Sequence, residues 1–379
     1  MSTLDSTTDI IVIGGGLAGL TSAIHLSKYD LKVLVIEKNE YPKHKVCGEY
    51  ISNEVLPYLN YLEVDVFKLG AKKITHFELS TPKNRLIKSG LPLGGFGISR
   101  FTLDNALAEK AKQNKVSMLQ DTVTNIQFIN DEFLIETKSK KKFKSKIAIG
   151  AYGKRSNLDV ELNRDFIKKK SPFLAVKTHL EGNFPEDLVA LHNFKGGYCG
   201  VSKVENNHIN ICYITNFEAF KKYKDINEFQ QKVVFKNRYL KTIFETSKPV
   251  FNMPLTISQI SFSTKTPIEN HIIMCGDTAG MIHPLCGNGM SMAIRSAQIA
   301  SQLILKYFTS EIKSREALEK AYLREWNSEF KSRLRTGHFV ANLFSQNKLA
   351  EFLIVFLKAV PFLLPQIIKR THGKPMQVK

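Results

Sequence analysis

Residues 9–39 read DIIVIGGGLAGLTSAIHLSKYDLKVLVIEKN, and this stretch determines the fold that we expect. Its β-branched run at 10–13 is typical of a short strand that is buried on both faces. Apolar residues at helical spacing follow the glycines, and a second β-branched run occupies 33–36. The stretch therefore predicts a strand, a helix and a second strand, which is the βαβ unit of a parallel sheet.

The glycines between the first strand and the helix predict a dinucleotide site. Gly14, Gly16 and Gly19 form G-x-G-x-x-G, and Glu37 follows about twenty positions later. Gly14 permits the tight turn, Gly16 lets the backbone approach a pyrophosphate, and Gly19 lets the helix pack closely on the strand. The free N–H groups of the helix N-terminus attract phosphate, and Glu37 can accept hydrogen bonds from an adenosine ribose. FAD and NAD both fit this pattern, whereas NADP is disfavoured.

A second strand–turn–helix pattern lies at 272–300, IIMCGDTAGMIHPLCGNGMSMAIRSAQIA. We expect a buried strand up to Cys275 and a helix from about Met290. Asp277, at the end of the strand, can bond a ribityl or ribose hydroxyl. The backbone N–H groups of the loop before the helix can stabilise a carbonyl that gains negative charge, as the pyrimidine edge of a flavin does on reduction.

This segment resembles the G-D-x-A-x-x-x-x-P-x-x-G-x-G motif of FAD-dependent oxidoreductases, most of all the geranylgeranyl-reductase-like and flavin-monooxygenase-like branch. Two further stretches are similar to that branch, YPKHKVCGEYIS at 41–52 and ISRFTLDNAL at 98–107. The resemblance implies that Arg100 contacts the ribose or pyrophosphate, that 287–290 line the flavin ring, and that Cys47 lies near its opposite side. It selects FAD as the cofactor.

The residues that we expect to bind FAD belong to these motifs or lie beside them in the sequence. They are Gly14, Gly16, Leu17, Ala18, Gly19, Glu37, Lys38, Lys45, Val46, Cys47, Gly48, Arg100, Val123, Ala151, Gly153, Gly276, Asp277, Pro284, Gly287, Asn288, Gly289 and Met290. One position departs from the family pattern: Tyr152 stands where many monooxygenases carry Asp in G-A-D-G. This departure weighs against NAD(P)H as a direct electron donor and leaves a protein donor, such as ferredoxin, open.

The middle of the chain alternates polar and apolar residues, as antiparallel strands with one wet face do. The expected fold is therefore α/β: a Rossmann-like FAD-binding domain interleaved with an antiparallel β-sheet substrate domain, plus C-terminal helices. The predicted FAD-binding domain comprises 1–70, 99–171 and 267–330. The predicted substrate domain comprises 71–98 and 172–266, and 331–379 form a helical cap or a membrane-contacting tail.

Composition restricts the partners. The chain has 54 Lys and Arg against 35 Asp and Glu, but no nucleic-acid-binding motif, so we expect no nucleic acid. Five scattered cysteines and a polar N-terminus without a leader pattern favour the cytoplasm. The mostly apolar stretch 348–370, followed by Lys374 and Lys379, fits a cap or peripheral membrane contact, whereas its charges and prolines count against a membrane span. Neither a metal site nor an oligomeric state is predicted.

Two chemistries share this scaffold. One is monooxygenase-like transfer of oxygen to an aromatic or phenolic lipid, towards which the sequence leans slightly. The other is geranylgeranyl-reductase-like saturation of isoprenoid double bonds. The substrate in both is a hydrophobic small molecule, and a flavin-binding protein without turnover is the third reading. The candidate catalytic residues are His283, Cys47 and Tyr198, each of which could instead be a packing or loop residue.

Overall fold

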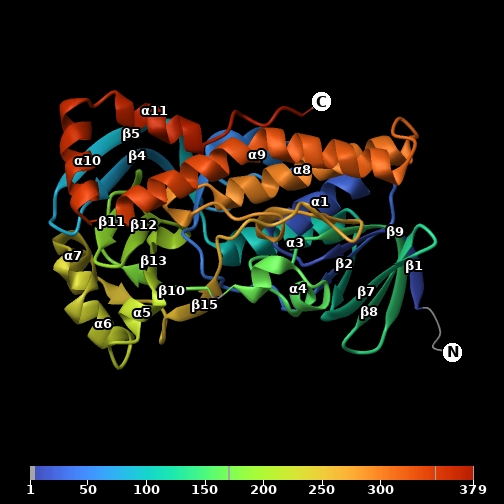
Figure 1. Cartoon of the computed structure of the whole chain (residues 1–379), viewed down its shortest axis with the longest axis horizontal. Helices are drawn as coiled ribbons and strands as arrows, with labels where there is room; N and C mark the ends of the chain where they lie inside the picture. Colours follow the sequence, from blue (N-terminus) through green and yellow to red (C-terminus); the bar gives the residue numbers. More distant parts are fainter. Residues whose placement is uncertain (1–4, 170, 346, 379) are drawn as a thin grey trace.

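The computed structural model describes residues 5–169, 171–345 and 347–378. Residues 1–4 of the polar N-terminus and Lys379 of the basic tail lie outside this part of the chain. Two β-sheets lie side by side, and long C-terminal helices run along both of them (Figure 1). The mixed α/β architecture with C-terminal helices is confirmed.

The first sheet is built on five parallel strands in the order β17-β9-β1-β2-β6. A short antiparallel strand, β16, flanks β17, and an antiparallel hairpin, β7 and β8, flanks β9. The strands are β1 (Ser6–Ile13), β2 (Val33–Glu37), β6 (Ser117–Gln120), β7 (Val123–Ile129), β8 (Glu132–Thr137), β9 (Lys142–Gly150), β16 (Ile268–Glu269) and β17 (Ile272–Met274).

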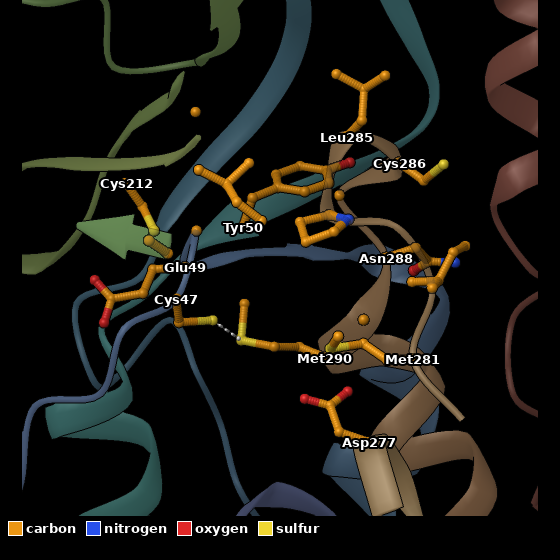
Figure 2. A pocket seen from close by; sticks show the side chains of 18 of the residues that line it. Cys47, Glu49, Tyr50, Cys212, Asp277, Met281, Leu285, Cys286, Asn288 and Met290 are labelled. Atoms are coloured by element: carbon orange, nitrogen blue, oxygen red, sulfur yellow. Dashed lines mark hydrogen bonds between the residues drawn. The ribbon is translucent and has the colours of Figure 1, made fainter. Parts of the chain in front are cut away.

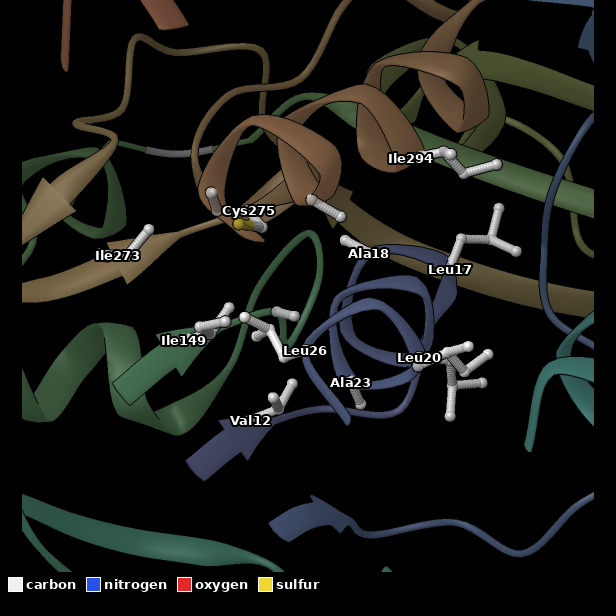
Figure 3. Packing of buried hydrophobic residues seen from close by; sticks show 14 of the residues in the cluster. Val12, Leu17, Ala18, Leu20, Ala23, Leu26, Ile149, Ile273, Cys275 and Ile294 are labelled. Carbon is white, nitrogen blue, oxygen red and sulfur yellow. The ribbon is translucent and has the colours of Figure 1, made fainter. Parts of the chain in front are cut away.

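Helices α1 (Leu17–Ser27), α3 (Arg100–Gln113) and α8 (Gly289–Phe308) pack together beside this sheet, and α9 (Arg315–Ser345) lies along α8 (Figure 1). Figure 3 shows α1 between β1 and α8, with Val12 and Ala23 on the side of β1 and Ala18 on the side of α8. Gly19 is required here because a Cβ at this position would lie 1.9 Å from the carbonyl oxygen of Gly14. The expected close approach of helix to strand is thus present.

The second sheet has the order β14-β10-β13-β12-β11-β4-β5-β3, with β15 paired to β10. It is mostly antiparallel, except that β4 and β11 run parallel. Its strands are β3 (Tyr50–Ser52), β4 (Lys72–Ser80), β5 (Leu86–Gly97), β10 (Phe173–Glu181), β11 (Leu188–Phe194), β12 (Gly197–Lys203), β13 (Ile209–Asn216), β14 (Lys248–Pro249) and β15 (Leu255–Ile260). The strand β3 comes from the range 1–70, so the second sheet also recruits the segment that follows Cys47. The predicted domain boundaries stay a prediction.

The prediction of one wet face on β10 and β13 is wrong, because both faces of these strands are buried. One face packs on α5 (Phe217–Phe220), α6 (Ile226–Lys232) and α7 (Arg238–Glu245) through a separate apolar core. The opposite face carries Lys177 and His179, which contact the buried carboxylate of Glu49 rather than water. The polar residues of the alternating pattern therefore belong to a buried ion cluster.

The C-terminal helices α10 (Asn347–Ala359) and α11 (Leu363–Thr371) cover the second sheet near β4 and β5 (Figure 1). Among the described residues, no single helix is long and apolar enough to cross a membrane; one pair, 349–359 and 363–371, passes on length and composition but is bent by 118°. The remaining helices are α2 (Leu56–Tyr61) and α4 (Asn157–Glu161).

After α11, residues 372–378 form an extended strap that contacts the segment after β3 and helix α8. Asn288 Nδ2 donates to the Thr371 carbonyl at 2.8 Å, and the Met376 amide donates to the Glu54 carbonyl at 2.8 Å. The Met376 side chain is buried in the main core. The strap thereby fixes the two cap helices to the loop that begins α8.

Acid sensitivity follows from three buried histidines. Burial lowers the pKa of His25, His192 and His283 to about 4 each. The unfolded chain takes up these protons near pH 6.5, so stability is lost progressively as the pH falls from about 6.5 towards 4. We expect His192→Asn to keep the contact with Ser80 Oγ while removing one titrating group. Urea unfolding between pH 7 and pH 4 should then show a shallower loss of stability than wild type. Equal slopes in the two proteins would contradict this assignment.

Candidate active site

A cavity with a volume of about 1010 Å³ lies between the two sheets. Its wall includes Gly16 from the glycine turn, Glu37 from the end of β2, and residues 276–277 and 287–290 from the second segment. These two segments, far apart in the sequence, therefore face one cavity. The two segments approach each other closely at Gly276, where an added Cβ would lie 3.3 Å from the Cβ of Ala18. The sequence predicts that both segments bind one elongated ligand, and the cavity that they share allows this.

Two helix N-termini open onto this cavity. Helix α1 begins after Gly16 and α8 begins after Asn288; neither start has a side-chain cap or an acidic residue in its first turn. Their free N–H groups and partial positive charges suit a pyrophosphate and an electron-rich carbonyl. Gly48 and Gly153 also line the cavity, and a Cβ at either would meet no atom within 4 Å. The wall thus leaves room where a cofactor needs close backbone approach, so its residues fit FAD.

Charged residues define the nucleotide end of the cavity. The Glu37 carboxylate accepts from the Gly15 amide at 2.7 Å and from the Asn39 amide at 2.9 Å, which ties β2 to the glycine turn. Arg100 forms a two-point ion pair with Asp104 at 2.6 and 2.7 Å, and Lys45 bonds Asp104 at 2.8 Å. Burial opposes ionisation of Asp104, but these two cations hold its pKa below the usual range. Arg100 and Lys45 thus keep fixed positions on the wall.

A buried ion cluster around Glu49 supports the Cys47–Gly48 segment from behind. The Glu49 carboxylate bonds Lys177 Nζ on one oxygen and His179 Nε2, at 2.8 Å, on the other. Burial would raise the pKa of Glu49, but Lys177 and His179 together hold it below its usual range. Asn210 Nδ2 donates to the Gly48 carbonyl at 2.8 Å. The second sheet thereby fixes the backbone that faces the second segment across the cavity.

The sequence pattern did not single out this cluster as functional. Glu49 lies inside the motif that carried the resemblance, whereas Lys177 is 128 residues away along the chain. The signal that could have found the cluster was a lysine and a histidine two positions apart on one strand face. That signal is equally typical of a solvated face.

A buried lysine holds the Asp277 loop. Lys265 Nζ donates to the carbonyls of Asp277 and Lys154 at 2.7 and 2.8 Å and lies 4.3 Å from the centre of the Phe166 ring. Burial lowers its pKa to about 8 despite Asp277 nearby. Lys265 therefore joins the loop after β9 to the loop after β17, both of which line the cavity.

The other end of the cavity is almost wholly apolar. Figure 2 shows Cys47 opposite Met290, with a sulfur–sulfur distance of 3.4 Å, and Tyr50 and Leu285 above them. Beyond these residues the wall continues between the second sheet and helices α9–α11. The apolar side chains of this wing are Phe77, Leu79, Leu91, Val189, Leu191, Ile214, Ile257, Ile260, Leu343, Phe344, Leu353, Leu357, Leu364, Ile367 and Ile368.

Two tyrosine hydroxyls are buried beside this wing. Tyr50 and Tyr198 both line the cavity, and neither hydroxyl has a side-chain hydrogen-bond partner among the described residues. Burial raises the pKa of both phenols well above the ordinary value. At neutral pH they are therefore protonated and able to donate a hydrogen bond to a ligand.

Four predicted residues lie behind the wall rather than on it. Gly14 and Gly19 shape the turn, and Val123 packs in the main core. His283 packs against the rings of Phe262 and Tyr198 at 4.6 and 5.7 Å, and its Nδ1 accepts from the Leu285 amide. With a pKa of about 4 it is neutral at pH 7. Its contacts are those of a residue that shapes the loop. The other predicted residues, Cys47 and Tyr198 included, lie on the wall.

Comparisons with known proteins agree with this geometry. A family profile described as FAD dependent oxidoreductase matches residues 9–49. Among curated proteins, the chain is 24% identical over 346 residues to a digeranylgeranylglycerophospholipid reductase of Methanosarcina acetivorans, covering 87% of this chain and 81% of that protein. The chain is an FAD-dependent oxidoreductase.

Two further proteins are similar to this chain, one in sequence and one in structure. The oxidoreductase is 22% identical over 359 residues to conditioned medium factor receptor 1 of Dictyostelium discoideum, covering 86% of this chain and 68% of that protein. It superimposes on a flavin-dependent brominase with a TM-score of 0.78 at 15% identity, covering 96% and 93% of the two chains. At this identity the structural likeness concerns the fold alone. FAD is the cofactor of this oxidoreductase.

Proposed function

We propose that this oxidoreductase saturates isolated double bonds in the isoprenoid chain of a lipid. The observation that carries the proposal is the apolar wing, which begins at the Cys47–Met290 contact and extends beneath the cap helices. An isoprenoid chain offers no polar group along its length. An extended apolar chamber recognises such a chain by burial, which contributes about 25 cal/mol per Å² of apolar surface.

The chemistry is divided between cofactor and chain. FAD, when bound and reduced, supplies hydride to one carbon of the double bond. The protein binds the chain, excludes water and provides the proton that the neighbouring carbon requires. Cys47 is the residue to which we assign the proton, because its thiol lies on the wall where the FAD-facing residues meet the apolar wing.

Relatives support the substrate class. Several of the curated relatives similar to this chain are named digeranylgeranylglycerophospholipid reductases. We extend to this chain only the class, an isoprenoid lipid. A protein donor remains part of the proposal, since Tyr152 occupies the position of the family's Asp. The cytoplasmic location is part of it too, because the five cysteines are free thiols.

A second candidate is oxygen transfer to a phenolic lipid, the monooxygenase-like reading. The two buried hydroxyls of Tyr50 and Tyr198 favour it, because they could hold a phenol oxygen at the inner end of the wing. The two candidates therefore differ in the lipid that is converted and in the product that is formed.

The test is single turnover with a purified, chemically reduced enzyme. A geranylgeranyl lipid is supplied without oxygen, and a phenolic prenyl lipid is supplied with oxygen. Mass spectrometry should show the addition of two hydrogens per double bond to the first substrate. Addition of one oxygen to the second substrate, without hydrogenation of the first, would overturn the proposal in favour of the second candidate. Bound flavin that converts neither substrate would indicate a flavin-binding protein without this turnover.

We expect Cys47→Ala to lower kcat about a hundredfold or more while bound flavin stays at the wild-type level, because a positioned acid typically contributes at least that factor. Cys199→Ala is the matched control, since Cys199 is buried in the separate core behind the second sheet. Stopped-flow reoxidation of the reduced enzyme by the lipid measures the rate. Unchanged turnover in Cys47→Ala would remove this residue from the chemistry.

A further inference from the structure

Helix α10 of the cap is apolar on two opposite sides. In α10, Leu353, Ile354 and Leu357 face inward, and two of them line the cavity. Phe352 and Phe356, spaced one helical turn apart, face outward and are 68% and 44% exposed. A helix that is apolar all round belongs in an apolar environment on both sides. Among the described residues, the rest of the protein supplies such an environment only on the inner side of α10.

Further exposed phenylalanines lie on the neighbouring segments. Phe362, at the bend before α11, is 68% exposed, and Phe339 near the end of α9, a helix that contacts both α10 and α11, is 64% exposed. We call Phe339, Phe352, Val355, Phe356 and Phe362 the outer cap face. Single exposed apolar residues are ordinary, but several exposed aromatic residues on neighbouring helices mark an interaction site.

The cavity opens at this part of the molecule. Phe339 and Arg370 both line the cavity and are both exposed, so they belong at once to its wall and to the outer surface of the cap. A hydrophobic chain that enters between them would pass directly from the outer cap face into the apolar wing. The guanidinium of Arg370 is placed to meet an anionic headgroup that stays outside.

The charge of the C-terminal segment indicates which kind of partner the outer cap face binds. Residues 331–379 contain nine Lys and Arg but a single acid, Glu351. That acid is already paired with Arg85 at 3.2 Å. Lys358, Lys369, Arg370 and Lys374 are exposed on the cap helices and on the strap that follows them. Aromatic residues ringed by cations fit the headgroup region of an anionic bilayer.

We infer that the outer cap face docks on an anionic lipid bilayer and that the substrate chain enters the cavity there, directly from the membrane. The inference rests on the proposed function only for the identity of the entering chain. The strap holds the cap by the Asn288–Thr371 and Glu54–Met376 bonds, so the face is displayed on a fixed scaffold. Docking thus places the mouth of the cavity against its source of substrate.

Vesicle flotation tests the inference with the flavin-loaded, full-length protein. Vesicles of phosphatidylcholine mixed with phosphatidylglycerol are compared with phosphatidylcholine alone. The test variant is Phe352→Ser/Phe356→Ser/Phe362→Ser, and the matched control is Met253→Ser/Phe217→Ser/Ile129→Ser, whose side chains are similarly exposed elsewhere. We expect wild type and control to float with the anionic vesicles and the test variant to bind at least about a hundredfold more weakly.

A charge variant adds a second readout. Lys358→Gln/Lys369→Gln/Lys374→Gln should lose about fivefold in anionic-vesicle affinity for each charge removed, since each contributes about 1 kcal/mol near such a surface. Wild type that stays in solution with every vesicle would overturn the inference. So would a wild-type dimer that the phenylalanine variant dissociates without any vesicle binding, because a second copy would then cover the face.

Reduction of a short, water-soluble prenyl substrate separates this inference from the proposed function. The phenylalanine variant should reduce that substrate as fast as wild type but reduce the same group in vesicles much more slowly. Vesicle binding that depends on the outer cap face, without reduction of any prenyl substrate, would support docking and overturn the proposed function. Equal rates on vesicles for wild type and variant would overturn docking alone.

Discussion

A Gly16→Val variant is expected to fold and to lose its bound FAD. Gly16 has φ −89° and ψ −171°, a conformation that valine adopts readily. The nearest atom to a Cβ at this position is Arg100 Nη2 at 3.5 Å, so the added side chain projects into the cavity. It would displace the pyrophosphate from the N–H groups of α1. Charge-assisted hydrogen bonds contribute about 1.5–3 kcal/mol each, so losing two of them weakens FAD at least about a hundredfold.

Gly90→Val is the matched control, because a Cβ there meets nothing within 4 Å and the residue lies in β5, off the cavity wall. The flavin content after purification and the urea unfolding curve should both match wild type in the control. The Gly16→Val apoprotein should unfold cooperatively without flavin. Stoichiometric flavin in that variant would contradict the placement of the pyrophosphate at α1.

A Lys177→Met variant should lose about 3–5 kcal/mol of unfolding free energy at neutral pH. The substitution leaves the Glu49 carboxylate fully buried without its lysine, bonded only to the His179 ring and the Arg100 amide among the described residues, and breaking a buried ion pair from one side costs about that much. The Cys47–Gly48 segment, which Lys177 also contacts through the Lys45 carbonyl at 3.2 Å, should loosen as well. Chemical denaturation at pH 7 measures the loss. Lys144→Met, which removes an exposed partner of Glu132, should change stability by less than about 1 kcal/mol.

The pH dependence of this loss has a definite sign. In wild type the lowered pKa of Glu49 contributes stability above the unfolded value, about 4.3, and that stability is lost as the pH falls through the folded value. Without Lys177, burial raises the pKa of Glu49, so the variant gains stability relative to wild type on acidification. The gap between the two proteins should therefore narrow from pH 7 towards pH 4. A gap that is small, or that is constant with pH, would show that Glu49 is not held ionised by Lys177.

The parts that the sequence revealed are those whose geometry depends on local residues. The β-branched run at 10–13 and the glycines after it define a strand, a turn and a helix within twenty positions, and the structure has all three. The strand at 272–274 and the helix from Gly289 follow from the same reasoning. In each case the backbone requirement and the residue that meets it are close in sequence.

The parts that the sequence missed depend on partners far apart along the chain. Lys177 and His179 follow the alternation of a solvated strand, and only the approach of Glu49 makes their positions buried. The cap could equally have been a core helix or a surface helix, because α10 is apolar on both sides. The strap was not predicted, since the small polar segment after Thr371 carries no periodic signal. Sequence patterns report polarity, whereas these features depend on which surfaces meet.

The most direct test of the central claim is an equilibrium titration of the apoprotein with FAD, followed by quenching of flavin fluorescence. If the glycine turn and the Asp277 loop hold opposite ends of one molecule, FAD should bind at one per chain, and NAD should not compete. Binding should weaken both in Gly16→Val and in Gly289→Val, which lies at the other helix start on the same wall. Binding of FAD that either variant leaves intact, or its displacement by NAD, would contradict the account.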